Sequence, residues 1–199
     1  LSQLFARVHE KATLKSFDLS VDGKLMRHEA QIDLVGDDAI VHMAGAVLGD
    51  GKRGAFHHDD TLFITHDALR CESRQVYKKV LKNGAQGVFQ GKILVKPDAQ
   101  KTDGYQISQA LLLDDDSQFL AKPELEIYAD DVACSHGCTS GELDETALFY
   151  LRSRGVPRPQ AEVLLVLSFL ADALEEVEDE DLRAALAVRL EDWLYRGAA

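Results

Sequence analysis

The sequence predicts a mainly β protein that ends in a small helical region, and three observations lead to this prediction. Between residues 13 and 135, short apolar runs alternate with turn signals, and the runs are too short for helices. Dipeptides that favour tight turns, such as Asp22-Gly23 and Asn83-Gly84, separate these runs. From Asp144 onward, the apolar residues follow the spacing of three to four residues that is typical of helices.

The first half of the chain is expected to form short strands, after a short opening helix over Leu4–Ala12. Turns of the Asn-Gly and Asp-Gly type favour hairpins, and so an antiparallel sandwich. Apolar runs that return about every 20 residues fit a parallel β-helix instead. The residues alone leave this choice open. The expected strands are Leu14–Leu19, Lys24–Leu34, Ala39–Leu48, Thr61–His66, Gly87–Val95, Gln106–Leu113 and Glu124–Ala129.

Three helices are expected to close the chain. Asp144 fits the N-cap of the first, over Glu145–Arg154, and Gly155 fits its C-terminal stop. The second is expected to begin near Ala161, after two prolines, and a third apolar series follows it. The acidic segment 175–181 is expected to be a solvated loop between these two helices. The apolar positions of the third helix are Leu182, Leu186, Leu190 and Trp193.

Composition narrows the classes of partner. The 199 residues are 46% hydrophobic and 28% charged, as in a soluble globular protein, with a net charge of −12. Such a charge repels nucleic acid and anionic lipid, so neither is an expected partner, and the longest apolar run is too short to cross a bilayer. Three sparse cysteines are typical of the reducing cytoplasm. The chain begins at Leu1 with no visible signal peptide, so we expect a fragment of a longer protein.

The familiar signatures of enzymes are missing from the sequence. It has no GxxxxGK[ST] phosphate loop and no GxGxxG motif between a strand and a helix. A GxSxG nucleophile elbow is also missing. We therefore expect a protein that is not an enzyme.

The densest group of metal-binding residue types is Cys134-Ser135-His136-Gly137-Cys138. Thiolates and imidazoles are ligands for zinc, iron and iron-sulfur clusters. In an extended strand the two cysteines and the histidine share one face, so all three are candidates for one ion. The alternative interpretation is structural, since cysteine often behaves as a small buried apolar residue.

Two further groups are weaker candidates. His57-His58-Asp59-Asp60, with His66 downstream, has metal-binding residue types, but adjacent histidines in a polar turn are more often simply exposed. Cys71 lies among charged neighbours without a visible partner, which favours a structural role.

Several segments together carry a family resemblance. The run from Leu125 to Gly137, followed by Gly141-Glu142-Leu143-Asp144-Glu145 and by residues 148–155, resembles the SufB/SufD family of iron-sulfur cluster assembly proteins. Within that family it is more similar to the SufD branch, chiefly through Tyr128-Ala129-Asp130-Asp131-Val132 and Cys134-Ser135-His136-Gly137. Residues 73–78, 87–92 and 99–106 contribute to the resemblance.

The resemblance implies a right-handed parallel β-helix core, residues 1–141, followed by a C-terminal helical region, residues 142–199. It also implies that an N-terminal helical region is missing. The implied role is a non-enzymatic scaffold that pairs with SufB through the β-helix and docks the SufC ATPase on its C-terminal helices. A transient iron-sulfur cluster shared with SufB is implied, and the isolated fragment is expected to hold no cofactor tightly and to be able to form a homodimer.

Carried over residue by residue, the resemblance makes His136 and Cys134 the candidate cluster ligands. Cys138 departs from the family, which usually has alanine there, so a three-ligand site in one chain is not expected. The implied SufC-interface candidates lie on the first helix. A purely structural dimerisation domain and a stand-alone metal-binding enzyme using Cys134, His136 and Cys138 remain the alternatives. The SufC-interface candidates are Phe149, Tyr150, Arg152 and Arg154.

Overall fold

The computed structural model describes residues 1–197, which form parallel strands followed by helices. The fold is therefore mainly β, as predicted. The strands are β1 (Ser2–Val8), β2 (Thr13–Val21), β3 (Leu25–Leu34), β4 (Ile40–Asp50), β5 (His57–His66), β6 (Glu72–Lys82), β7 (Gln86–Val95), β8 (Asp103–Leu112), β9 (Gln118–Ile127) and β10 (Ala133–Gly141). The helices are α1 (Glu145–Ser153), α2 (Arg158–Leu174) and α3 (Glu180–Gly197), with a 3-10 turn at Gly51–Arg53.

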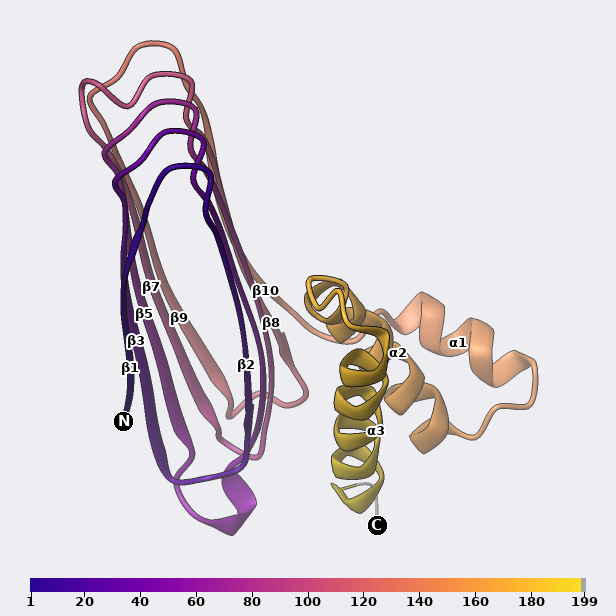
Figure 1. Cartoon of the computed structure of the whole chain (residues 1–199). Helices are drawn as coiled ribbons and strands as arrows, with labels where there is room; N and C mark the ends of the chain where they lie inside the picture. Colours follow the sequence, from indigo (N-terminus) through magenta and orange to yellow (C-terminus); the bar gives the residue numbers. More distant parts are fainter. Residues whose placement is uncertain (198–199) are drawn as a thin grey trace.

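The strands form a β-solenoid with two sheets that face each other (Figure 1). One sheet has the order β1-β3-β5-β7-β9 and the other the order β10-β8-β6-β4-β2, and all pairs are parallel. Leu34 pairs with His66 and His66 with Val95, so each turn takes about 30 residues. Asn83-Gly84 connects strands of opposite sheets and makes no hairpin. The parallel β-helix is confirmed over the sandwich.

The core lies between the two sheets, because side chains of each strand alternate between the inside and the outside. In β3, the alternate residues Ala30, Ile32 and Leu34 are buried, and they are partnered in register by Leu62, Ile64 and His66 of β5. Aligned rows of side chains therefore run through the interior from turn to turn.

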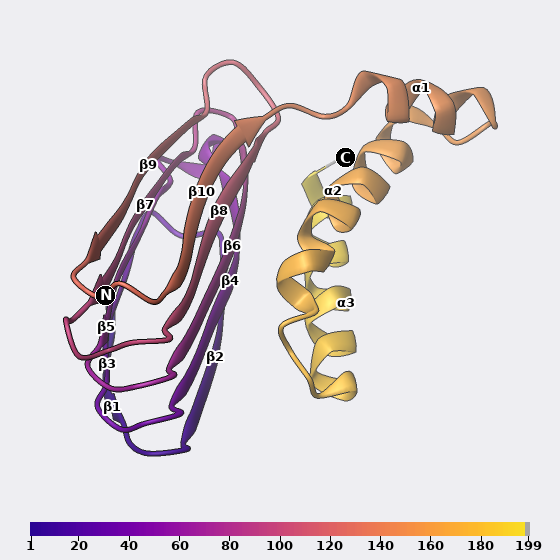
Figure 2. The ribbon, with the colours of Figure 1, turned by 90° about the horizontal axis from the view of Figure 1, so that it is seen from above.

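The helices cover only one of the two sheets. α2 packs on the outer face of β4 and β6, where its Val166 and Leu170 join one apolar cluster with Leu48 and Val80. Figure 2 shows α2 and α3 beside the even-numbered strands, while α1 extends away from the solenoid. No helix within residues 1–197 has the length and apolar character needed to cross a membrane.

The helix boundaries follow their predicted signals. The Asp144 side chain accepts hydrogen bonds from the backbone N–H groups of Thr146 and Ala147, which confirms it as the N-cap of α1. Gly155 follows α1 with a φ of +86°. α2 begins at Arg158, earlier than expected, because Pro159 is tolerated in the first turn of a helix.

The acidic loop between α2 and α3 is less free than predicted. Glu176 forms an ion pair with Arg74 of β6 at 2.7 Å, and Glu178 forms one with Lys15 of β2 at 2.5 Å. The Asp179 side chain accepts a hydrogen bond from the N–H of Leu182 near the start of α3. The loop therefore ties the helices to the sheet.

Two sequence predictions about elements were wrong or incomplete. Residues Leu4–Ala12 do not form a helix, because Leu4, Ala6 and Val8 alternate into the core as part of β1. The strands β6 and β10 were not predicted, since β6 carries several charged residues and β10 has few apolar ones. Both strands belong to the sheet that the helices cover.

Candidate functional site

The residues of the CSHGC run lie on β10, which is the last strand of its sheet and pairs only with β8 among the described strands. Cys134, His136 and Cys138 lie on the inward side of β10, in register with Gly104, Gln106 and Ser108 of β8. The two cysteines and the histidine therefore share one face of the strand, as the sequence predicted. These three side chains therefore line the open end of the interior. 

The spacing along β10 keeps these side chains apart. Residues two apart on a strand are separated by about 6.6 Å and residues four apart by about 13 Å, whereas zinc–sulfur bonds measure about 2.3 Å. Consistently, no group of three or more His, Cys, Asp or Glu side chains in residues 1–197 is arranged to hold a metal ion. The three residues do not converge on one ion within this chain.

Both cysteines on β10 are half-buried thiols with apolar neighbours. Cys134 packs against the cluster that contains Ile93 and Val95, and Cys138 packs against the main interior cluster. Burial raises the pKa of both thiols, although backbone hydrogen bonding opposes it. The protonated thiol is therefore favoured in the free chain, and a metal has to displace that proton.

His136 is exposed, but the residue beneath it is fully buried. Gln106 of β8 occupies the same interior row, and its Nε2 donates a hydrogen bond to Oε1 of Gln75 on β6 at 2.8 Å. Ser108, which lies beneath Cys138, is also fully buried. In the last turn, His136 and Cys138 therefore lie next to buried polar side chains of β8.

The candidate interface residues on α1 form a mixed aromatic and basic surface. Phe149 is 73% exposed and Tyr150 is 55% exposed, whereas Leu148 of the same helix is buried. The guanidinium of Arg154 lies over the Tyr150 ring, 4.3 Å from the ring centroid. Arg152 lies in the last turn of α1. α1 projects from the solenoid (Figure 2), and Arg154 is its C-cap residue.

The histidine-rich segment from His57 is a strand and not an exposed turn. His58, Asp60 and His66 of β5 are buried in the interior, so the interpretation of an exposed pair of histidines was wrong for His58. Burial lowers the pKa of His58 to about 4, with Lys79 adding to the effect, and burial lowers the pKa of His66 to about 4. Both histidines are neutral at pH 7.

A buried polar network that the sequence analysis missed surrounds His58. Lys79 of β6 contacts Asp60 in an ion pair and lies 3.1 Å from Nδ1 of His58. His58 Nε2 is 3.0 Å from the Ser20 hydroxyl. Burial raises the pKa of Tyr77 well above its usual value of 10. Lysine is rarely buried, so its position gave no signal for this network.

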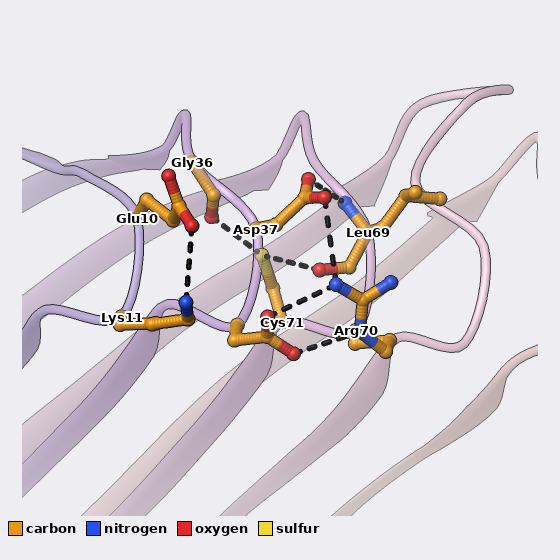
Figure 3. A network of polar contacts seen from close by, with 8 residues as sticks. Glu10, Lys11, Gly36, Asp37, Leu69, Arg70 and Cys71 are labelled. Carbon is orange, nitrogen blue, oxygen red and sulfur yellow. Dashed lines mark hydrogen bonds and ion pairs between the residues drawn. The ribbon is translucent and has the colours of Figure 1, made fainter.

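Cys71 lies buried at a corner of the solenoid, among the polar contacts that Figure 3 shows. It is buried, and its Sγ donates to the carbonyl oxygens of Gly36 at 3.3 Å and Leu69 at 3.7 Å. Burial raises the pKa of this thiol. At the same corner, Arg70 forms an ion pair with Asp38 at 2.8 Å. The contacts join successive turns of the solenoid.

These corners have a repeated backbone feature. One non-glycine residue with a φ between 55° and 59° precedes each of the strands β2, β4, β6 and β8. The N–H of each such residue donates to a carbonyl in the following turn, as in the hydrogen bond from Arg70 to Gln100 at 3.0 Å. The stacked corners keep the turns in register. The residues concerned are Lys11, Asp38, Arg70 and Lys101.

Comparison with known proteins agrees with this architecture. Residues 1–169 match the model of the family described as SUF system FeS cluster assembly, SufBD core domain. The iron-sulfur cluster assembly protein SufD of Escherichia coli (strain K12) is 33% identical over 189 residues, which are 95% of this chain and 44% of that protein. The chain is also similar to the chloroplastic protein ABCI7 of Arabidopsis thaliana, at 30% identity over 90% of this chain and 37% of that protein.

A third relative is the iron-sulfur cluster assembly protein SufD of Bacillus subtilis (strain 168), at 31% identity over 82% of this chain and 37% of that protein. The chain spans less than half the length of each of these three relatives. The matching family model covers the whole solenoid, α1 and most of α2. The chain therefore belongs to the SufBD core family of the SUF system for iron-sulfur cluster assembly.

Proposed function

We propose that this chain is the scaffold part of a SufD-type subunit, which assembles iron-sulfur clusters together with SufB and SufC and passes them to apoproteins. The observation that carries the proposal is the open last turn of the solenoid. There, the inward-facing row of β10 presents His136 to solvent beside the half-buried Cys134. A second chain that covers this end would enclose both candidate ligands.

The edges of the last turn support pairing with another β-helix. Among the described strands, β9 pairs only with β7 and β10 only with β8, so each has a free edge. Free edges are templates for strand addition by another chain. The inward-facing Ala121 of β9 is exposed, although Phe89 in the same row is fully buried. SufB is the partner proposed for this surface, and a homodimer through it is proposed for the isolated chain.

His136 and Cys134 are the proposed ligands of a transient cluster shared with SufB. The protonated Cys134 thiol gives little affinity for iron in the free chain, because a cysteine ligand must first lose its proton. A site completed by the partner would supply the remaining ligands. For the same reason, we propose that the isolated chain holds no cofactor tightly.

The surface of α1 is the proposed docking site for SufC. Phe149 and Tyr150 are large exposed side chains on a short helix that lies away from the solenoid. Aromatic and arginine side chains are enriched at the centres of protein interfaces. Arg152 and Arg154 are the basic members of this surface. In this proposal residues 1–141 form the scaffold domain and residues 142–199 the docking region.

The proposed scaffold is not an enzyme, and the ATP hydrolysis of the complex is assigned to SufC. A stand-alone metal-binding enzyme is disfavoured, because Cys134, His136 and Cys138 are too far apart along β10 to bind one ion. A purely structural dimerisation domain is the remaining alternative. The free cysteines support a location in the cytoplasm.

Pairing with SufB is tested by adding a charge at the open end. Ala121→Lys places an ammonium group on the inward row of β9, where it is solvated in the free chain but buried in a complex. Leu120→Lys is the matched control, since Leu120 is 53% exposed on the outer face of the same strand. Co-purification with SufB should fall at least about tenfold for Ala121→Lys only. Equal co-purification of both variants would contradict the proposed surface.

Docking of SufC is tested separately on α1. Phe149→Ala removes the most exposed aromatic side chain of that helix, and Leu182→Ala removes an exposed apolar side chain of α3 as the control. SufC binding, measured by titration of the SufB complex, should weaken for Phe149→Ala and not for Leu182→Ala. Unchanged binding of both variants would exclude Phe149 from the interface.

A further inference from the structure

One row of interior side chains on the even-numbered sheet becomes polar toward the open end and ends at His136. In the order of strands from β4 to β10, this row consists of Met43, Gln75, Gln106 and His136. Gln75 and Gln106 are each 0% exposed. Two buried amides in a solenoid core are costly unless their polar groups are satisfied, and both Nε2 of Gln75 and Oε1 of Gln106 are buried without a hydrogen-bond partner within residues 1–197.

Of the two polar atoms of the Gln106 amide, only Nε2 makes a hydrogen bond within residues 1–197. Its Nε2 donates to Oε1 of Gln75 at 2.8 Å, which directs the amide nitrogen toward β6. Its Oε1 is buried and has no hydrogen-bond partner within residues 1–197. On the side of Gln106 away from Gln75, the next residue of the row is His136 of β10.

The opposite sheet leaves room for this amide. Gly91 of β7 lies across the interior, and a Cβ on Gly91 would come within 2.2 Å of Gln106 Nε2. The Gln106 amide therefore occupies space that a side chain at position 91 would fill.

We propose that Gln106 is a positioning residue for His136: the exposed imidazole, which makes no hydrogen bond to Oε1 in the structure, turns to donate one ring N–H to this oxygen. That hydrogen bond fixes the tautomer, so the other ring nitrogen keeps its lone pair and faces the open end of the solenoid. Metal-binding histidines almost always donate their second ring N–H to such an acceptor. The inference rests on the proposed role of His136 as a cluster ligand, but its first test does not.

The first test measures the tautomer of His136 in the metal-free chain. Nitrogen-15 NMR of the labelled imidazoles at mildly alkaline pH should show one dominant tautomer for His136. His9 is exposed in the loop after β1 and provides a free imidazole in the same spectrum. If His136 showed the same tautomer mixture as His9, the proposal would be overturned.

Variants then identify the acceptor. Gln106→Met keeps the length of the side chain and removes Oε1, so His136 should revert to the mixture seen for His9. Gln106→Glu keeps an acceptor of the same reach and should preserve the wild-type tautomer. Thermal unfolding checks that both variants fold. An unchanged tautomer in a folded Gln106→Met variant would overturn the proposal.

The second test separates this inference from the proposed function. Cluster yield is measured after anaerobic iron and sulfide reconstitution of the complex with SufB and SufC. The expected result is a several-fold lower yield for Gln106→Met than for wild type. If the tautomer changes but His136→Ala still forms a full cluster, the positioning stands and the ligand role fails. If His136→Ala abolishes the cluster but the His136 tautomer is the same in wild type and Gln106→Met, the ligand role stands and the positioning role fails.

Discussion

Lys79 of β6 and Asp60 of β5 form an ion pair that spans the two sheets inside the solenoid, with their side chains 0% and 1% exposed. A third polar side chain lies beside the pair: His58 is 3.1 Å from the Lys79 ammonium and 3.5 Å from Asp60. Lysine and aspartate are almost never buried unless they are paired. The pair therefore fixes the relative position of consecutive strands that belong to opposite sheets.

Breaking this pair should destabilise the chain strongly. Lys79→Met leaves the Asp60 carboxylate buried without its cation, which should lower the free energy of unfolding by about 3 to 5 kcal/mol. Lys79→Met combined with Asp60→Leu removes both charges and should recover much of the loss. Urea unfolding followed by circular dichroism measures both effects. Lys15→Met, which breaks an exposed pair with Glu178, should leave the midpoint nearly unchanged. A double variant as unstable as Lys79→Met would contradict this account of the pair.

Acid should destabilise the solenoid through its buried histidines. Burial lowers the pKa of His66 to about 4, so the unfolded chain binds a proton that the folded chain does not bind. The stabilisation from neutral His66 is complete above about pH 6.5 and is lost as the pH falls toward 4. It amounts to about 3 kcal/mol.

His66→Gln isolates this contribution, and His9→Gln is the matched control at an exposed position. Urea unfolding at about pH 7.5 and about pH 5 should show a smaller loss of stability for His66→Gln than for the wild type. The control should follow the wild type. The same pH dependence in all three proteins would mean that His66 does not titrate as its burial requires.

The N-cap of α1 should determine the stability of the proposed SufC surface. Asp144→Ala removes two hydrogen bonds to the backbone, which should destabilise the helix by about 1 kcal/mol. Hydrogen exchange of the α1 amides should accelerate, while that of α2 stays as in the wild type. Asp144→Asn keeps an acceptor and serves as the control. Unchanged exchange in Asp144→Ala would show that packing against α2 alone maintains α1.

The interior row that contains Tyr77 has a tight contact that limits substitution. A Cβ on Gly45 of β4 would lie 2.7 Å from the Tyr77 ring, which is 0% exposed. Gly45→Ala should therefore lower the free energy of unfolding by about 1 to 3 kcal/mol, as overpacked cores do. Gly141→Ala has open space around its Cβ and should be nearly neutral. Thermal unfolding of both variants measures the difference, and similar midpoints would contradict the tight contact.

The helical region and most strands were predictable because their signals are local. Asp144 and Gly155 mark the ends of α1 through capping, and the apolar spacing of α2 reflects one buried face. The pairing of strands was not predictable from periodicity, because Asn83-Gly84 makes a corner between sheets as readily as a hairpin. The family resemblance supplied the parallel arrangement.

The chemistry at the open end was predictable only in part. Alternation along a strand correctly puts Cys134, His136 and Cys138 on one side, but the rise per residue prevents them from meeting at one ion. The buried partners were not predictable, since Gln106 and Lys79 reach the interior through a register that only the fold defines. Polar residues on a strand carry no local mark of the side they face when both sides contain polar groups.

The most direct test of the central claim is anaerobic iron and sulfide reconstitution of the full-length protein with SufB and SufC. The absorbance of the cluster bands is compared among wild type, His136→Ala and Cys138→Ala, after size-exclusion chromatography confirms that each complex is intact. If His136 is a cluster ligand, His136→Ala loses the cluster signal and Cys138→Ala keeps a normal one. A normal cluster signal for His136→Ala in an intact complex would contradict the ligand role and leave this chain a structural partner.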